Sequence, residues 1–118
     1  MANPNIVSVS SIYGGNAGWN LSNTLTATLL TVDAEKIVKI NSIICSNVDG
    51  TNDATVNVSV SGSANFNTRR YILKTVDVPA DSTVVIEKPI NLGAGDKLET
   101  QASANDDIDV FASILEMT

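Results

Sequence analysis

Apolar and polar side chains alternate along much of the chain, which is the period of a β-strand with one buried face. The clearest run extends from Ala54 to Gly62, where valine occupies every second position between Thr, Asn and Ser. The run from Ile108 to Ile114 alternates in the same way and leaves Phe111 on the polar side. Strands of this kind bury one face and present the other to solvent, so the pattern predicts an all-β fold.

Turn-forming residues separate the alternating runs. Asp, Asn, Gly and Pro gather at residues 49–53, 79–82, 93–96 and 105–107, where they favour tight turns. Short strands at this spacing are typical of a single antiparallel β-sandwich, and we expect a jelly-roll-like arrangement of about eight strands. The predicted strands cover residues 6–12, 24–32, 36–47, 54–62, 70–76, 83–90, 97–103 and 108–116.

The length of 118 residues suits one domain, and we expect a single sandwich over residues 1–118. Residues 1–5 are expected to form a short N-terminal arm. The stretch 13–20 is rich in glycine and holds the only tryptophan, Trp19. Because clustered glycines interrupt a strand pattern, this stretch is predicted to be a loop.

Charge and residue content argue against several functions. The net charge is −6 at pH 7 with only 7 Lys and Arg, so we expect no binding to nucleic acid or to anionic membranes. The sequence has no histidine and one cysteine, Cys45, which leaves out the commonest general base and any cysteine-based zinc site. We therefore expect no enzyme, no catalytic residue and no cofactor, and we expect Cys45 to be a small buried hydrophobic residue.

Asp106, Asp107 and Asp109 form the densest acidic group in the sequence. Calcium prefers several carboxylate and carbonyl oxygens, so these residues would be its ligands if a site existed. A solvated turn between two strands explains the same residues, because Asp and Asn favour turns. We favour the turn and expect no metal.

Several side chains are candidates for contact with a partner. Trp19 is a residue type that often anchors interfaces, although it could instead cap the open end of the sandwich. The pair Arg69 and Arg70 could bind a carboxylate or lie exposed at the start of a strand. Phe111 and Leu115 share the polar side of the last strand, which indicates a subunit interface. The expected interface residues are Pro4, Tyr13, Trp19, Arg69, Arg70, Phe111 and Leu115.

A longer pattern of strands and turns begins at residue 78. It contains a strand, a turn with Pro79, a second strand, the motif Leu-X-X-Gly-Asp at residues 92–96 and a final hairpin. This pattern resembles small virion structural proteins of tailed phages, notably marine and cyanobacterial ones. The resemblance implies a structural role and transfers no binding residue, since such proteins serve as head decoration or cement proteins, neck parts, or tail and fibre components.

These observations lead to two hypotheses of different classes. The first is a capsid decoration protein, made in the host cytoplasm and located in the virion, with a tail, neck or fibre component as its nearest rival. It would bind a capsid or other virion protein and form a homo-oligomer, for which a trimer is favoured. The second is a carbohydrate- or host-surface-binding sandwich. In that protein Tyr13 and Trp19 would stack on a sugar, and the acidic group would hold Ca²⁺.

Overall fold

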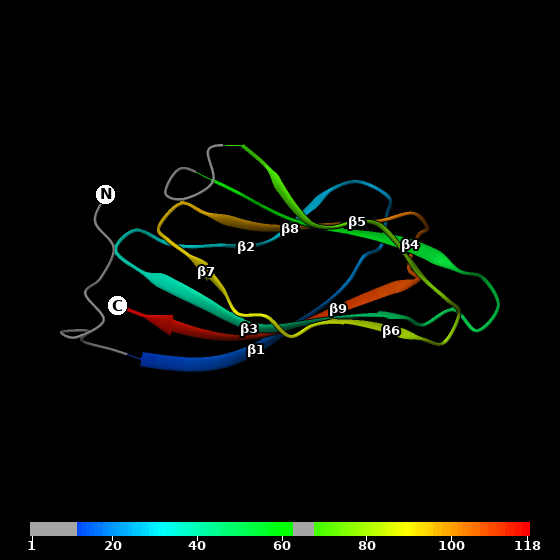
Figure 1. Cartoon of the computed structure of the whole chain (residues 1–118), viewed down its shortest axis with the longest axis horizontal. Coiled ribbons are helices and arrows are strands. Elements are labelled where there is room, and N and C mark those ends of the chain that lie inside the picture. Colours follow the sequence, from blue (N-terminus) through cyan, green and yellow to red (C-terminus); the bar gives the residue numbers. More distant parts are fainter. Residues whose placement is uncertain (1–11, 63–67) are drawn as a thin grey trace.

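The computed structural model describes residues 12–62 and 68–118, which form two antiparallel sheets packed face to face (Figure 1). The all-β sandwich predicted from the sequence is confirmed. Within these residues no helix is long and apolar enough to cross a membrane. The strands are β1 (Ile12–Asn20), β2 (Ala27–Thr31), β3 (Ile37–Asn47), β4 (Ala54–Ser61), β5 (Arg70–Val78), β6 (Thr83–Ile86), β7 (Ile90–Leu92), β8 (Lys97–Ala102) and β9 (Ile108–Met117).

The order of the strands is that of a jelly roll. One sheet has the order β1-β9-β3-β6, with β7 also paired to β3, and the other has the order β2-β8-β4-β5. The first strands in the sequence therefore pair with the last ones, and the pairing continues towards the middle of the chain. The pairs are β1 with β9, β2 with β8, β3 with β6 and β7, and β4 with β5. A long antiparallel hairpin that is rolled into two layers gives this pairing, as in jelly-roll domains.

The inner faces of the two sheets form the core, and the alternation read from the sequence determines which side chains enter it. Val56 and Val58 of β4 have no accessible surface, and neither has Ile43 of β3. Ile108 and Val110 of β9 are buried at the positions that the pattern predicts. The predicted inner faces of β4 and β9 are thus confirmed.

Cys45 lies on β3 inside this core and has no accessible surface. Burial raises the pKa of its thiol to about 11. Thiolate, the reactive form, is therefore scarce at neutral pH. The prediction that Cys45 is a small buried hydrophobic residue is confirmed.

The glycine-rich stretch 13–20 is not the predicted loop. It belongs to β1, which pairs with β9 along its whole length without a register shift. The small residues of β1 lie opposite bulky ones of β9, with Gly14 beside Leu115 and Gly18 beside Phe111. A Cβ placed on Gly18 would lie 3.8 Å from the Phe111 ring. Gly14 and Gly18 stay exposed although these β9 side chains lie beside them, so β1 is a strand that shows no alternation of its own in the sequence.

The predicted strand at residues 83–90 is divided into β6 and β7. Pro89 lies between them, and proline has no N–H to donate to a sheet. β7 pairs with residues 38–40 of β3, and β6 pairs with residues 43–46. Between these two segments, at Ile40 and Ser42, the pairing of β3 with β9 shifts its register. The other predicted strands differ from the observed ones only at their ends.

Three expectations concern residues that the structure leaves undescribed. The predicted arm at residues 1–5 and its contact residue Pro4 lie outside the described residues. The predicted strand at residues 6–12 also lies outside them, apart from Ile12, where β1 begins. These expectations remain predictions.

Candidate interaction surface

The outer face of the β1-β9-β3-β6 sheet carries an apolar row that crosses several strands. Ile44 of β3 is the register partner of both Phe111 of β9 and Val85 of β6, so the three side chains lie next to one another. Phe111 is 43% exposed and Val85 is 48% exposed. We call these three residues the apolar row. Ile44 is partly exposed. Three adjacent apolar side chains that contact solvent indicate a surface that can bury apolar area against a partner.

A polar row borders the apolar row on one side. Ser46 of β3 is the register partner of Asp109 and of Thr83, and the hydroxyl oxygens of Ser46 and Thr83 are 3.2 Å apart. The Asn20 side-chain amide donates to Oδ1 of Asp109 at 2.6 Å. These polar groups bind one another, which leaves the apolar row as the distinctive feature of this part of the sheet.

Leu115 lies farther along the same face than Phe111. Its register partners are Gly14 of β1 and Lys39 of β3, and it is only partly exposed. Ser113 lies between Phe111 and Leu115 on this face. The two apolar residues therefore share the outward side, as the sequence predicts, but belong to separate rows.

Arg69 and Arg70 have different surroundings. Arg70 is exposed at the start of β5, whereas Nη2 of Arg69 lies 3.0 Å from Oε2 of Glu99 on β8. The hydroxyl of Ser61 also donates to Glu99. Burial raises the pKa of Glu99, but the hydrogen bonds from Ser61 and Arg69 and the charge of Arg69 outweigh burial and bring this pKa below its usual value. Both arginines are exposed, but the guanidinium group of Arg69 binds Glu99 within the chain.

Tyr13 and Trp19 lie at opposite ends of β1, separated by about 20 Å of extended strand. Tyr13 is 64% exposed, and its ring passes over Gly15, within 3.2 Å of where a Cβ would be. Trp19 is partly buried and packs against the core. Two aromatic residues so far apart on one strand cannot both stack on the same sugar ring.

The acidic candidates do not converge on one point. Asp106 adopts a φ of 63° in the turn before β9, and Asp109 accepts the hydrogen bond from Asn20. Burial, and after it the nearby carboxylate of Asp49, raises the pKa of Asp107. Across residues 12–62 and 68–118, no group of three or more His, Cys, Asp or Glu is placed to hold a metal ion.

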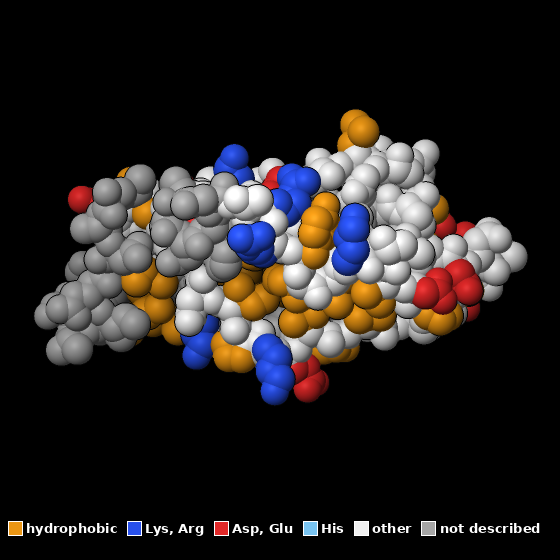
Figure 2. All heavy atoms as spheres, turned by 45° about the horizontal axis from the view of Figure 1, so that its top comes forward, with side chains coloured by type: hydrophobic (Ala, Val, Ile, Leu, Met, Phe, Trp, Pro, Cys, Tyr) orange, Lys and Arg blue, Asp and Glu red, His pale blue; other side chains and the backbone are white. Residues whose placement is uncertain are grey.

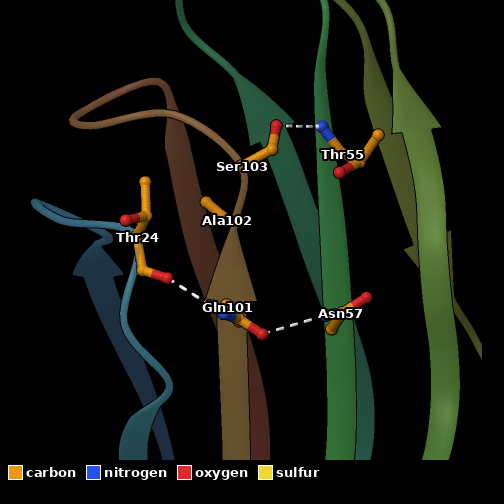
Figure 3. Close-up of a pocket in the computed structure, with 6 residues that line it drawn as sticks. All are labelled: Thr24, Thr55, Asn57, Gln101, Ala102 and Ser103. Carbon is orange, nitrogen blue, oxygen red and sulfur yellow. Dashed lines mark hydrogen bonds between the residues drawn. The ribbon is translucent and has the colours of Figure 1, made fainter.

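A shallow polar pocket of about 340 Å³ lies on the outer face of the other sheet (Figure 3). The Gln101 side chain accepts from the amide of Asn57 at 3.1 Å and donates to the carbonyl of Thr24 at 2.9 Å. The polar groups of the pocket therefore bind one another, and its described lining has no aromatic or charged side chain for a sugar or an ion. The lining consists of Thr24, Thr55, Asn57, Gln101, Ala102 and Ser103.

The face drawn in Figure 2 carries both hydrophobic and acidic side chains. Viewed obliquely from the side of the β2-β8-β4-β5 sheet, hydrophobic side chains form a band along the middle, and acidic side chains gather at the right-hand end (Figure 2). The loops after β3, β5 and β8 meet there, since the N–H of Val48 donates to the carbonyl of Asp107 and the N–H of Asp81 to that of Asp49. This end of the molecule disfavours anionic partners.

No protein-family model matches the sequence, and no curated protein matches it. Solved structures share the fold. A chain of the T13 IBDV viral particle has a TM-score of 0.57 at 8% identity, over 91% of this chain and 30% of that chain. A chain from the acid-stable capsid of Helicobacter pylori bacteriophage KHP30 has a TM-score of 0.52 at 13% identity, over 93% and 90% of the two chains.

A third likeness is to a chain of the disulfide-linked pili of Bacillus endospore appendages. Its TM-score is 0.51 at 14% identity, and it covers 92% of this chain and 87% of that one. This chain therefore spans about a third of the IBDV chain but most of the other two. The likenesses establish a jelly-roll sandwich that viral capsids and pili both use.

Proposed function

We propose that this chain is a non-enzymatic structural protein of a phage virion, and that it binds the outer surface of the capsid as a decoration protein. One observation supports this role above the others: the whole sandwich, rather than a part of it, superposes on a chain of a bacteriophage capsid over 93% and 90% of the two lengths. The resemblance of the pattern that begins at residue 78 to phage virion proteins supports the same role.

The apolar row provides the contact that such a role requires. Phe111 lies between Gly18 and Ile44, and Val85 extends the row to the sheet edge. An aromatic side chain surrounded by smaller apolar groups can be fully desolvated against a partner, which is typical of residues that contribute most to binding. We propose the apolar row as the centre of the capsid contact, with the exposed Arg70 as a contact elsewhere on the surface.

Binding to purified shells tests this role. Shells assembled from the major capsid protein of the same phage are mixed with the protein and sedimented. The variant Phe111→Ser changes the apolar row, and Leu25→Ser is the matched control because Leu25 is 72% exposed and lies outside it. We expect the wild type and Leu25→Ser to co-sediment and to protect the shells against heat. We expect Phe111→Ser to bind about tenfold to a hundredfold more weakly.

Each result of this experiment has a defined meaning. A wild-type protein that does not bind the shells contradicts the decoration role. Equal binding by the wild type and Phe111→Ser contradicts the apolar row as the contact. Immunogold labelling of virions separates the rival position, because label on the tail, neck or fibres instead of the shell would favour the alternative within the same class.

We also propose that the protein forms trimers, as decoration proteins at local symmetry axes would. Light scattering on a sizing column should then give three times the 12.4 kDa of one chain, or a multiple of that mass. The mass should be the same in Ca²⁺ and in EDTA. A monomer that Ca²⁺ stabilises would contradict this proposal and favour the carbohydrate- or host-surface-binding alternative, which a glycan array would then test.

A disulfide-linked filament is the role that the endospore pili would suggest. The sequence has one cysteine, and Cys45 has no accessible surface. A disulfide to a neighbouring subunit would require the core to open. The buried thiol therefore argues against this assembly and for contacts formed by surface side chains.

A further inference from the structure

The outer strands of the two sheets differ in their protection. An outer strand presents unpaired backbone N–H and C=O groups that can pair with a strand of another chain. Natural sheets limit such pairing with short strands, bulges, proline or charged side chains. In the part of the chain that the structure describes, the outer strands are β1 and β6 with β7 in one sheet, and β2 and β5 in the other.

Every outer strand except β1 has such protection. β2 has 5 residues and a register shift between Thr28 and Leu30, and β6 and β7 have 4 and 3 residues. β5 has two register shifts against β4 and a φ of 52° at Thr75. It also carries Lys74, whose ammonium group lies 4.5 Å from the centre of the Tyr71 ring. These features oppose continuous pairing at three of the edges.

β1 has none of these features. It spans 9 residues in unbroken register with β9, and it contains no proline and no charged side chain. Most of its residues are exposed, including Gly14, Asn16 and Gly18. Among the described residues no strand lies on its other side. No described strand therefore pairs with the backbone groups on that side of β1.

The sequence of β1 is also nearly symmetric about Asn16. Residues 13–19 read Tyr-Gly-Gly-Asn-Ala-Gly-Trp. If the same strand of a second copy paired in antiparallel fashion with Asn16 facing Asn16, Gly14 would face Gly18 and Tyr13 would face Trp19. Aromatic pairs across antiparallel strands are stabilising, and glycine facing glycine leaves no side chains to collide. Two copies of net charge −6 would also meet where neither is charged.

We propose that the β1 strands of two copies pair in antiparallel fashion about Asn16 and join two subunits into one continuous sheet. The contact has two-fold symmetry and is closed, since the same residues contribute from both sides. It uses the edge of the sheet, whereas the proposed capsid contact uses the outer face. A two-fold contact does not create a trimer but links one trimer to the next. The pairing of β1 can therefore be tested independently of the proposed function.

Cysteine crosslinking tests both the contact and its register. Gly14→Cys and Gly18→Cys are made as separate proteins, and each new Cβ would lie no closer than 3.8 Å to a neighbouring atom. Both are oxidised with oxidised glutathione, alone and mixed, and examined on non-reducing gels. Residue 14 would face residue 18 of the other copy and not residue 14. We therefore expect the mixture to give at least about tenfold more disulfide-linked dimer than either protein alone.

Two further variants complete the test. Asn16→Cys should form the dimer without a partner variant, because residue 16 would face itself. Thr28→Cys on β2 is the matched control, since it is also exposed on an outer strand, and it should give little dimer. Cys45 is buried in every variant and should not contribute.

Defined results would overturn the inference. If folded Gly14→Cys and Gly18→Cys give no dimer when mixed, or dimerise as well alone, the register about Asn16 is wrong. If Thr28→Cys dimerises as well as Asn16→Cys, the crosslink reports chance collision. Charge gives an independent measurement: Asn16→Lys and Asn16→Glu should each lower the mass measured by light scattering, because like charges would separate the β1 strands, and mixing the two variants should restore the wild-type mass. A mixture of folded variants that does not regain this mass would also overturn the pairing.

Discussion

At the scale of single residues, the backbone of Gly62 packs closely against Asp96. Gly62 follows β4 with a φ of 147°, and a Cβ there would lie 2.4 Å from Cα of Asp96. Asp96 has no accessible surface, and its Oδ2 accepts a hydrogen bond from the N–H of Gly93 at 2.9 Å. Neither the backbone at Gly62 nor the buried Asp96 can easily shift, so position 62 requires a residue without a Cβ.

Replacing this glycine should therefore destabilise the protein. Gly62→Ala is expected to lower the free energy of unfolding by about 2–4 kcal/mol, because strain at positive φ adds to a collision with backbone. Gly18→Ala is the control, since its Cβ would make only ordinary contact with Phe111, and we expect a change within about 1 kcal/mol. Urea unfolding measures both, and equal effects would show that the turn around Asp96 yields.

At the scale of the strands, contacts between side chains connect elements that lie far apart in the sequence. Ser61 at the end of β4 and Arg69 before β5 both reach Glu99 on β8. Their combined effect keeps the pKa of Glu99 low although burial opposes this. The charged form of Glu99 thus helps to hold three neighbouring strands in place.

Removing Arg69 should make the stability depend differently on pH. A lowered pKa in the folded state means that the stabilisation is present above the unfolded pKa of Glu, about 4.3, and is lost as the pH falls through the folded value. Arg69→Met should cost about 1 kcal/mol at pH 7, a modest amount because the Arg69 side chain is 40% exposed. The difference from the wild type should shrink by pH 3.

Urea unfolding at pH 7 and pH 3 measures this effect, with Arg70→Met as the control. Arg70 is the exposed neighbour, and its replacement should change stability little at either pH. A difference between wild type and Arg69→Met that persists undiminished at pH 3 would show that Arg69 acts through packing of its aliphatic part and not through Glu99.

Some of the strands can be predicted from the sequence pattern, and others cannot. β4 and β9 follow from their alternation because each buries its own side chains. β1 does not, because its glycines have no side chains to alternate and its place in the sheet comes from pairing with β9, which lies far away in the sequence. Pro89 was a visible signal for the division of β6 from β7. The outward position of Phe111 follows from counting along β9, but its neighbours Ile44 and Val85 do not, since strand register between distant segments is absent from local patterns.

At the scale of the whole molecule, β3 lies near the middle of its sheet, between β9 and β6. Cys45 on β3 is covered by the opposite sheet and has no accessible surface. Its exposure therefore requires the two layers to separate or β3 to leave the sheet, and the thiol reports on opening of the core.

Reaction of the protein with a thiol reagent measures this opening. We expect Cys45 to react more than about a hundredfold more slowly in buffer than in concentrated urea, because both burial and the pKa of about 11 suppress the thiolate. Its midpoint of exposure in urea should coincide with the loss of β-sheet circular dichroism. Rapid reaction in buffer would instead reveal local opening near β6.

The central position of β9 has a consequence for synthesis. β9 is the last of the described strands to leave the ribosome, yet it lies between β1 and β3 in the finished sheet. β1 therefore has no partner strand until β9 has emerged, and folding must then close a loop that contains all the described strands between β1 and β9. During this interval the unprotected edge of β1 is exposed on nascent chains, and neighbouring ribosomes on one message would bring such edges together.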